Sequence, residues 1–426
     1  MKSNIFKAAA LSSLLIGAFA FAQEKKLDNY NSPDKSSINA FETKKDSTSV
    51  YDGLKVKVGG AFALQFQGIK HFSDADQTVP ATTLYNIGNN FNLATANLDI
   101  DVALYDGVNL HLRTFLSSRH HNEAYVKGGY LQIDKLDFIK KDFLKDVMDY
   151  TTIKIGHDEI NYGDAHFRRT DNAYATANPF VGNLLMDAFS TQVFLELYYQ
   201  KNGWLGMAGV SNGKLNQNAQ SGAASPSTYV KVGYDKQIDN DLRVRLTGSV
   251  YHTAQTKRTD FYDGDRAGSR YYFVMENAAA TSSANFRSGQ VIPGFANKLT
   301  AYMINPFVRY KGLEFFGTFE SASGRSFPET ENRKFNQYAA ELLYRFSNDN
   351  FFVGGKYNRV DGKLAPSAGG HDIDVTRYNV GAGWFMTKNI LTKLEYVNQK
   401  YNGYPTTSIL NGGKFDGFVL EAAISF

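Results

Sequence analysis

Apolar and polar residues alternate with a period of two along most of the chain after residue 53. In the last segment, FDGFVLEAAISF, one face carries only the apolar side chains Phe418, Leu420, Ala422, Ile424 and Phe426. The segments RVRLTGSVY (243–251), NQYAAELLYRF (336–346) and DVTRYNVGAGWF (374–385) repeat the pattern. A period of two is typical of β-strands. The opposite faces carry charged residues, so we expect no dry core behind them.

The alternation predicts about sixteen strands, near residues 54–68, 92–104, 108–117, 126–134, 151–157, 188–200, 203–211, 228–236, 241–253, 299–310, 313–321, 335–346, 351–360, 374–385, 390–400 and 415–426. The connections between them alternate in length. Short ones such as KG at 311–312 and SNDN at 347–350 are followed by long ones such as 158–187 and 254–298. Short turns on one rim and long loops on the other are typical of a transmembrane β-barrel. Aromatic residues near the strand ends of the apolar faces fit an interfacial girdle.

The short turns also predict which residues lie opposite one another in neighbouring strands. They place four oppositely charged pairs on the charged faces: Arg309 with Glu314, Glu341 with Lys356, Asp101 with His111, and Asp99 with Arg113. Such pairs are individually weak in water, at about 0–1 kcal/mol. They are informative because separate turns, considered independently, all place charged residues on the same face of the sheet.

The regions outside the strands complete the predicted domain organisation. Residues 1–22 have a basic start, an apolar run and an Ala20-Phe21-Ala22 end, which predict a cleaved signal peptide. Residues 23–52 are polar and aperiodic, so we interpret them as a flexible periplasmic lead-in, with a plug inside the lumen as the less favoured alternative. Residues 135–150 have helical apolar spacing and predict a short helix on the short-turn rim. The barrel itself covers residues 53–426.

Composition narrows the class of protein further. The 426 residues include no cysteine, which excludes disulfides and thiolate metal sites. No later apolar run reaches about 18 residues, so no helical membrane span is expected. Lys and Arg number 46 against 42 Asp and Glu, so the charge gives no argument for nucleic-acid binding. A chain with 14% aromatic residues and 37 glycines that lacks helical spans is either an outer-membrane barrel or a large soluble β-protein.

A cluster of charged residues stands out in IKIGHDEINYGDAHFRRTDNA, residues 153–173. Its candidate site residues are Asp158, Glu159, Asp164, His166, Arg168, Arg169 and Asp171. The acidic groups suit one wall of a pore or a cation, and the arginines suit anions through bidentate hydrogen bonds. Two other interpretations stay open: a solvated loop tip, and a metal site, although the spacing matches no strong motif such as HExxH. Asp260, Asp263 and Asp265 suggest calcium only weakly because the EF-hand spacing is incomplete. We therefore expect no cofactor.

The signal peptide, the strand number, the alternating loops and the terminal Phe426 together resemble the sixteen-stranded bacterial porins. The 153–173 stretch is similar to porin-like proteins of Bacteroidetes-type bacteria, and more loosely to phosphate-selective porins and alginate-export barrels. The resemblance implies a Gram-negative outer membrane, with its lipid and lipopolysaccharide as surroundings. It also implies a third external loop that narrows a water-filled pore for small hydrophilic solutes, and it raises a homotrimer as an expectation. Inward positions predict a pore lining of Arg243, Arg245, Arg309, Glu314, Glu341, Arg345, Lys356, Arg377, Lys393 and Glu395. Since basic residues exceed acidic ones there, we expect mild anion preference.

Two alternative functions come from other classes. The first is a substrate-specific channel or exporter for phosphate, sugar or polysaccharide. A sugar channel would need an aromatic track along the lumen, and the inward-facing Phe194, Tyr198, Phe307 and Phe316 do not form an obvious continuous path. A rim hydrolase is the less favoured alternative. His120 and His121 lie near Ser117 and Ser118, but the chain has no GxSxG motif. We therefore expect a channel and no enzymatic activity.

Overall fold

The described residues of this computed structural model, 27–45, 51–116, 125–169, 174–214, 224–262, 270–281 and 287–426, form sixteen strands. The predicted signal peptide lies outside these residues. The strands are β1 (Lys55–Phe72), β2 (Asn90–Tyr105), β3 (Val108–Phe115), β4 (Tyr125–Ile133), β5 (Thr151–Glu159), β6 (Thr191–Lys201), β7 (Trp204–Ser211), β8 (Ser227–Gln237), β9 (Leu242–Thr253), β10 (Lys298–Tyr310), β11 (Leu313–Arg325), β12 (Arg333–Phe346), β13 (Phe351–Lys363), β14 (Asp372–Thr387), β15 (Ile390–Asn402) and β16 (Lys414–Ser425).

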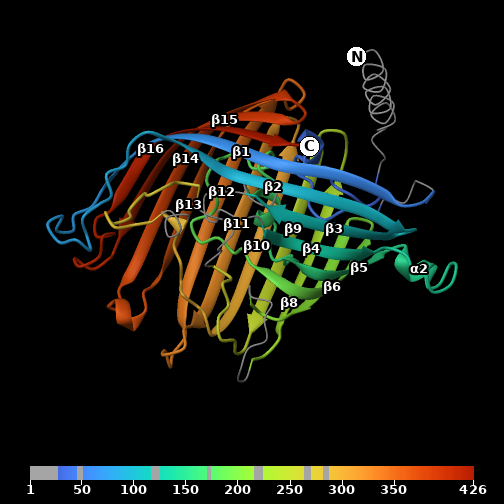
Figure 1. Ribbon diagram of the computed structural model, residues 1–426, viewed down its shortest axis with the longest axis horizontal. Coiled ribbons are helices and arrows are strands. Elements are labelled where there is room, and N and C mark those ends of the chain that lie inside the picture. The colour runs from blue at the N-terminus through green and yellow to red at the C-terminus, as the bar shows by residue number, and fades with distance from the viewer. Residues whose placement is uncertain are drawn as a thin grey trace, which may run out of the picture.

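The strands form one closed antiparallel barrel in chain order (Figure 1). The barrel closes where β16 pairs with β1 in a register that places Ala61 opposite Ser425. Phe426 continues this seam, since its backbone exchanges hydrogen bonds with Gly60. Closure leaves no unpaired sheet edge, which is the condition for a sheet to cross a membrane. The predicted fold class is confirmed.

Alternation along the strands separates an outer apolar face from an inner polar face. On β12, Tyr338, Leu342 and Tyr344 are exposed on the outside, whereas Glu341 and Arg345 are buried inside. Aromatic side chains line the outer face near the short turns, where Phe351 stacks between Phe346 and Trp384. This band is the arrangement expected of a girdle at a membrane interface.

The four predicted cross-strand pairs all have the predicted register. Three of them are also in direct contact: Asp99 with Arg113 at 2.7 Å, Asp101 with His111 at 2.7 Å, and Glu341 with Lys356 at 3.1 Å. In the fourth pair Arg309 turns to Asp349 in the next short turn, because Glu314 is held by Arg345. The register prediction is therefore correct, and one of its contacts is wrong.

Several strands extend further toward the long loops than the alternation predicted. β1 continues to Phe72, β11 to Arg325 and β13 to Lys363. Backbone pairing continues there without the strict alternation that a lipid-facing wall requires. The short-turn rim matches closely, because compact turns fix where a strand ends.

Helical structure among the described residues is limited to short pieces. They are η1 (Lys35–Ser37), α2 (Lys145–Met148), η2 (Ala165–Arg168) and η4 (Pro366–Ala368). The helix predicted within 135–150 is confirmed only as the four-residue α2, which lies just before the first residue of β5 (Figure 1). No helix in the described part of the chain is both long and apolar enough to cross a membrane.

Candidate functional site: the lumen of the barrel

The third long connection, residues 160–190 between β5 and β6, contacts inward-facing side chains on the opposite wall. The Lys393 ammonium group donates to the carbonyl oxygens of Ala175, Asn178 and Phe180 at 2.9–3.2 Å. The Glu395 carboxylate accepts from the backbone N–H of Val181 at 2.8 Å. Loop 3, as residues 160–190 are called below, is therefore attached to the wall through its own backbone.

The attachment continues along β12–β14 with neutral and basic side chains. The Asn358 side chain accepts from the Leu185 N–H at 2.7 Å, and Gln337 both accepts from the Met186 N–H and donates to its carbonyl. The Arg377 guanidinium donates to the Asn183 carbonyl at 2.7 Å. Backbone polar groups away from water need such partners, so these side chains allow an irregular segment to lie inside the barrel.

At the near end of loop 3, four charged groups form a buried cluster. Asp164 lies 2.7 Å from the Lys231 ammonium group and accepts two hydrogen bonds from Arg245, each 2.8 Å long. Glu42 lies 2.7 Å from both Lys231 and Arg245. Two anions and two cations thus alternate in space. We call Glu42, Asp164, Lys231 and Arg245 the ion tetrad.

The tetrad keeps its carboxylates ionised. Burial opposes the charged form of Glu42, but Lys231 and Arg245 outweigh it and lower the Glu42 pKa to about 2. Burial opposes the charge of Asp164 as well, and the same two cations lower its pKa well below the ordinary value. Glu42 and Asp164 are therefore charged at every physiological pH.

The two arginines of the charged cluster, Arg168 and Arg169, form ion pairs with different partners. Arg168 contacts Glu314 at 2.9 Å and Glu341 at 3.1 Å, and it also donates to the side chain of Asn39. Arg169 pairs with Asp187, a second residue of loop 3. Arg168 therefore ties the loop to the barrel wall, whereas Arg169 ties two parts of the loop together.

The remaining members of the cluster lie at the beginning of the loop. Asp158 and Glu159 are the last residues of β5 and therefore belong to the barrel wall. The sequence analysis had placed both of them in the loop. The His166 ring lies 2.9 Å from the Asn161 side-chain oxygen and 3.9 Å from Glu159. Burial, with Lys231 nearby, lowers the His166 pKa to about 3, so the ring is neutral. Asp171 lies outside the described residues.

The predicted pore-lining residues face the lumen, but most do not face open water. Arg377, Lys393 and Glu395 are at most 1% exposed because they lie under loop 3. Arg345 and Lys356 are buried in pairs with Glu314 and Glu341. The charges closest to an opening are on Arg243, which pairs with Asp235 at 2.7 Å, and on Arg309 at the rim.

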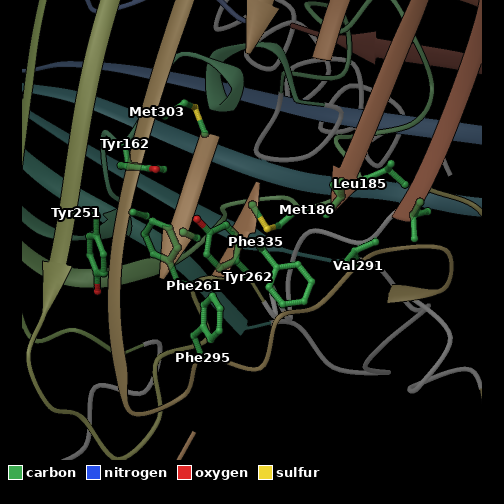
Figure 2. Close-up of a cluster of buried hydrophobic side chains, with 14 of the residues drawn as sticks. Tyr162, Leu185, Met186, Tyr251, Phe261, Tyr262, Val291, Phe295, Met303 and Phe335 are labelled. Atoms are coloured by element: carbon green, nitrogen blue, oxygen red, sulfur yellow. The ribbon is translucent and has the colours of Figure 1, made fainter. Parts of the chain in front are cut away.

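A second long connection, residues 254–297 between β9 and β10, also fills the lumen. Figure 2 shows its Phe261, Tyr262, Val291 and Phe295 packed with Leu185 and Met186 of loop 3 and with side chains of the wall. The cluster holds buried polar groups, since the hydroxyls of Tyr162 and Tyr262 both donate to Glu320. The expectation that no dry core lies inside is therefore wrong, because the loops bring in the apolar groups that the walls lack.

The sequence analysis predicted a long connection at 254–298, but it did not predict that this connection packs inside the lumen. The signal that could have revealed it is the pair of apolar runs YYFVM (271–275) and VIPGF (291–295), which a solvated loop does not need. Wall residues hold the first of these runs through its backbone and through the side chain just before it. Gln67 donates to the Tyr272 carbonyl and accepts from its N–H, and Arg270 contacts Glu421 at 3.0 Å.

The interpretation of the N-terminal segment as a flexible lead-in is wrong for residues 27–45. Phe41 is buried between Phe167 and Phe307, and Glu42 belongs to the ion tetrad. Asn39 donates to Glu314 at 2.6 Å. The less favoured alternative, a plug in the lumen, describes these residues, because a few placed polar and aromatic groups are enough to hold a short polar segment against charged walls.

Two cavities remain between the N-terminal segment and the walls. The vestibule, of about 1070 Å³, lies at the short-turn end and is lined by Lys57, Lys201 and Arg243 among others. The inner cavity, of about 120 Å³, is lined by residues of β2–β6, loop 3 and the N-terminal segment. Both cavities are lined by Tyr30, Phe41 and Glu42, so they adjoin at this point.

The residues considered for metal binding or catalysis lie only partly within the described residues. These residues contain no group of three or more His, Asp or Glu side chains placed to hold a metal ion. Asp260 pairs with Arg258 at 2.7 Å, and Asp263 and Asp265 lie outside the described residues. The serine and histidine residues considered for a hydrolase, 117–121, lie outside them as well.

Comparison with known proteins identifies the fold and not a family. No protein-family model matches the chain, and no curated protein matches its sequence. An anion-selective porin from Comamonas acidovorans matches 88% of this chain and 100% of its own, with a TM-score of 0.54 at 11% identity. The outer-membrane channel DcaP of Acinetobacter baumannii matches 89% and 99%, with a TM-score of 0.54 at 11% identity. OmpT, an outer-membrane protein of Vibrio cholerae, matches 88% and 99%, with a TM-score of 0.51 at 13% identity. The chain therefore has a porin-like fold.

Proposed function

We propose that this protein is an outer-membrane channel through which small hydrophilic solutes diffuse. The observation that carries the proposal is a closed sixteen-strand barrel with an apolar outer face and charged inner residues, some of which contact loop 3. The aromatic girdle near the short turns and the porin-like fold support an outer-membrane location. Membrane lipid and lipopolysaccharide are then the surroundings of the barrel. The homotrimer implied by the porin resemblance stays a prediction, which cross-linking in detergent would test.

The proposed constriction consists of Asp158, Glu159, Asp164, His166, Arg168 and Arg169 with their partners. Opposite charges that face each other across a narrow opening select solutes by size and charge. The ion tetrad and the Arg168 contacts with Glu314 and Glu341 support this role, since they hold loop 3 across the lumen. Asp171 belongs to the proposal only as a neighbour in sequence.

The vestibule supports the proposed mild anion preference, although only Arg243 and Arg245 of the charges responsible were expected. Six basic side chains line it, Lys44, Lys45, Lys57, Lys201, Arg243 and Arg245, against the acidic Asp34, Glu42 and Asp235. Arg377 and Lys393, which also supported the expectation, bind loop carbonyl oxygens instead. A positive mouth raises the local concentration of anions.

A solute-specific channel is the second candidate, and the filled lumen favours it. Loop 3 packs with described residues of 254–297 into an apolar core, and the inner cavity beside loop 3 has only about 120 Å³. Such a space fits a small molecule and not a polysaccharide chain. Export of a polymer would require both loops to leave the lumen.

Reconstitution tests the proposal directly. Purified protein in planar bilayers should give stable, small conductance steps without any added substrate, and a salt gradient should give a reversal potential that favours anions weakly. Liposomes carrying the protein should swell in small sugars and stop swelling as the sugar size increases. The absence of any conductance from inserted, folded protein would refute the channel, and a reversal potential favouring cations would refute the anion preference.

A further inference from the structure

A smaller cavity lies where loop 3 meets the barrel wall. Its volume is about 10 Å³, which leaves room for one water molecule or one halide ion and excludes larger ligands. Loop 3 provides most of the lining, including Arg168, and the wall provides Glu341 on β12 and Lys356 on β13. Arg169 and Asp187 also line it and form an ion pair with each other. The cavity is therefore part of the contact that attaches the loop to the wall.

The ion network at this contact has more positive than negative charges. Its members are the cations Arg168, Arg345 and Lys356 and the carboxylates Glu314 and Glu341. Each of the five residues is at most 6% exposed. Among the described residues these three cations form no ion pair with any other carboxylate. The network therefore keeps one positive charge in excess, and a buried charge without a counter-charge is costly.

One hydrogen-bond donor of the network also lacks an acceptor. Arg168 donates through Nη1 to the Asn39 side chain and through Nη2 to two glutamates. Its Nε–H group is buried and has no partner among the described residues. The Lys356 ammonium group, which has three N–H donors, lies nearby, because both cations contact the same Glu341 carboxylate. A particle in the cavity must therefore accept hydrogen bonds, and a halide ion supplies the missing negative charge as well.

We propose that this cavity binds one halide ion, such as chloride, which accepts hydrogen bonds from the Arg168 Nε–H and the Lys356 ammonium group. The ion joins loop 3 to the wall at the point where the network has excess charge. Glu341 opposes an anion there, but each of its carboxylate oxygens already contacts one of the two cations. The inference goes beyond the proposed channel function, because the ion is a resident part of the structure and is not the solute that passes.

Bromide identifies the site directly, because it is a halide that can be located by anomalous scattering. Crystals of the unmodified full-length protein in sodium bromide should show one anomalous peak between Arg168 and Lys356. If these side chains are well ordered and no peak appears, the cavity holds water and the proposal is overturned. This measurement decides the proposal even if a variant fails to fold.

Thermal unfolding in detergent tests whether the ion stabilises the fold. Sodium bromide should raise the unfolding midpoint saturably relative to sodium gluconate at equal ionic strength, since gluconate is too large for the cavity. Lys356→Gln removes the excess charge and should abolish this difference. Lys311→Gln, the same change at an exposed lysine in the turn between β10 and β11, should keep it and so corrects for general salt effects. Equal bromide effects in the two variants would overturn the proposal.

The remaining outcomes separate this proposal from its neighbours. An anomalous peak without any bromide effect on the unfolding midpoint would show an adventitious ion only and would refute the role in holding loop 3. A peak and a bromide-dependent midpoint in a protein that does not conduct would support the halide site and refute the channel. A conducting protein without the peak would leave the channel and refute the site.

Discussion

Replacing Asp164 with alanine should detach loop 3 from the barrel wall. Asp164 accepts hydrogen bonds from Arg245 and Thr247, each 2.8 Å long, and lies 2.7 Å from Lys231. Removing one partner of a buried ion cluster costs about 3–5 kcal/mol. The lower value applies because Glu42 still contacts both cations at 2.7 Å. A loss of about 3 kcal/mol shifts the equilibrium between attached and detached loop by about a hundredfold.

Single-channel recording measures this shift. The variant should show larger and noisier conductance steps than the unmodified protein, because a detached loop exposes more of the lumen to ions. Its thermal unfolding midpoint in detergent should also fall. Asp241→Ala is the matched control, because this aspartate is more than half exposed and its ion pair with Lys311 is long, at 3.9 Å. Identical current traces and unfolding midpoints for the Asp164 and Asp241 variants would refute the reasoning.

Three further predictions concern the same loop. Changing Arg168 and Arg169 together to alanine should alter conductance or ion selectivity without affecting membrane insertion, as bilayer recording and heat-modifiable gel mobility would show; unaltered currents would contradict this. Lowering the pH should loosen the loop. His166 has a folded pKa of about 3 against about 6.5 when detached, so the stability it contributes is lost progressively as the pH falls from about 6.5 toward 3. In the unmodified protein the current noise should therefore rise as the pH falls through this range. His166→Gln should make that rise smaller, and a pH response equal to that of the unmodified protein would count against the prediction. Gly163→Ala should shift the loop, because Gly163 has a φ of +68° and a Cβ there would collide with Met303; a normal unfolding midpoint would refute this.

The barrel could be predicted from the sequence because its signal is local and repeated. Each strand shows its own alternation, and each short turn fixes the register of two strands, so Glu341 opposite Lys356 followed from the SNDN turn alone. The inward direction of Arg245, Arg377 and Glu395 followed in the same way. These predictions needed no knowledge of distant parts of the chain.

The contents of the lumen could not be predicted in this way. Asn39 is 275 residues away from its partner Glu314, and Glu42 meets Lys231 and Arg245 from a segment with no periodicity. A charged inner face is compatible with open water, with ion pairs or with a covering loop. Only the three-dimensional positions of loop 3 and residues 254–297 decide between these arrangements. The sequence predicted correctly that Lys393 faces inward, but it did not predict that Lys393 donates hydrogen bonds to the carbonyl oxygens of loop 3.

Some of the side chains that hold both loops come from the last two strands of the chain. Lys393 and Glu395 lie on β15 and Glu421 lies on β16, the strand that also closes the barrel against β1. The interior therefore cannot be sealed while these last strands are unpaired. During insertion the growing sheet must carry its two large loops without these last contacts, and pairing of the final strands completes the wall and its contacts with the loops together.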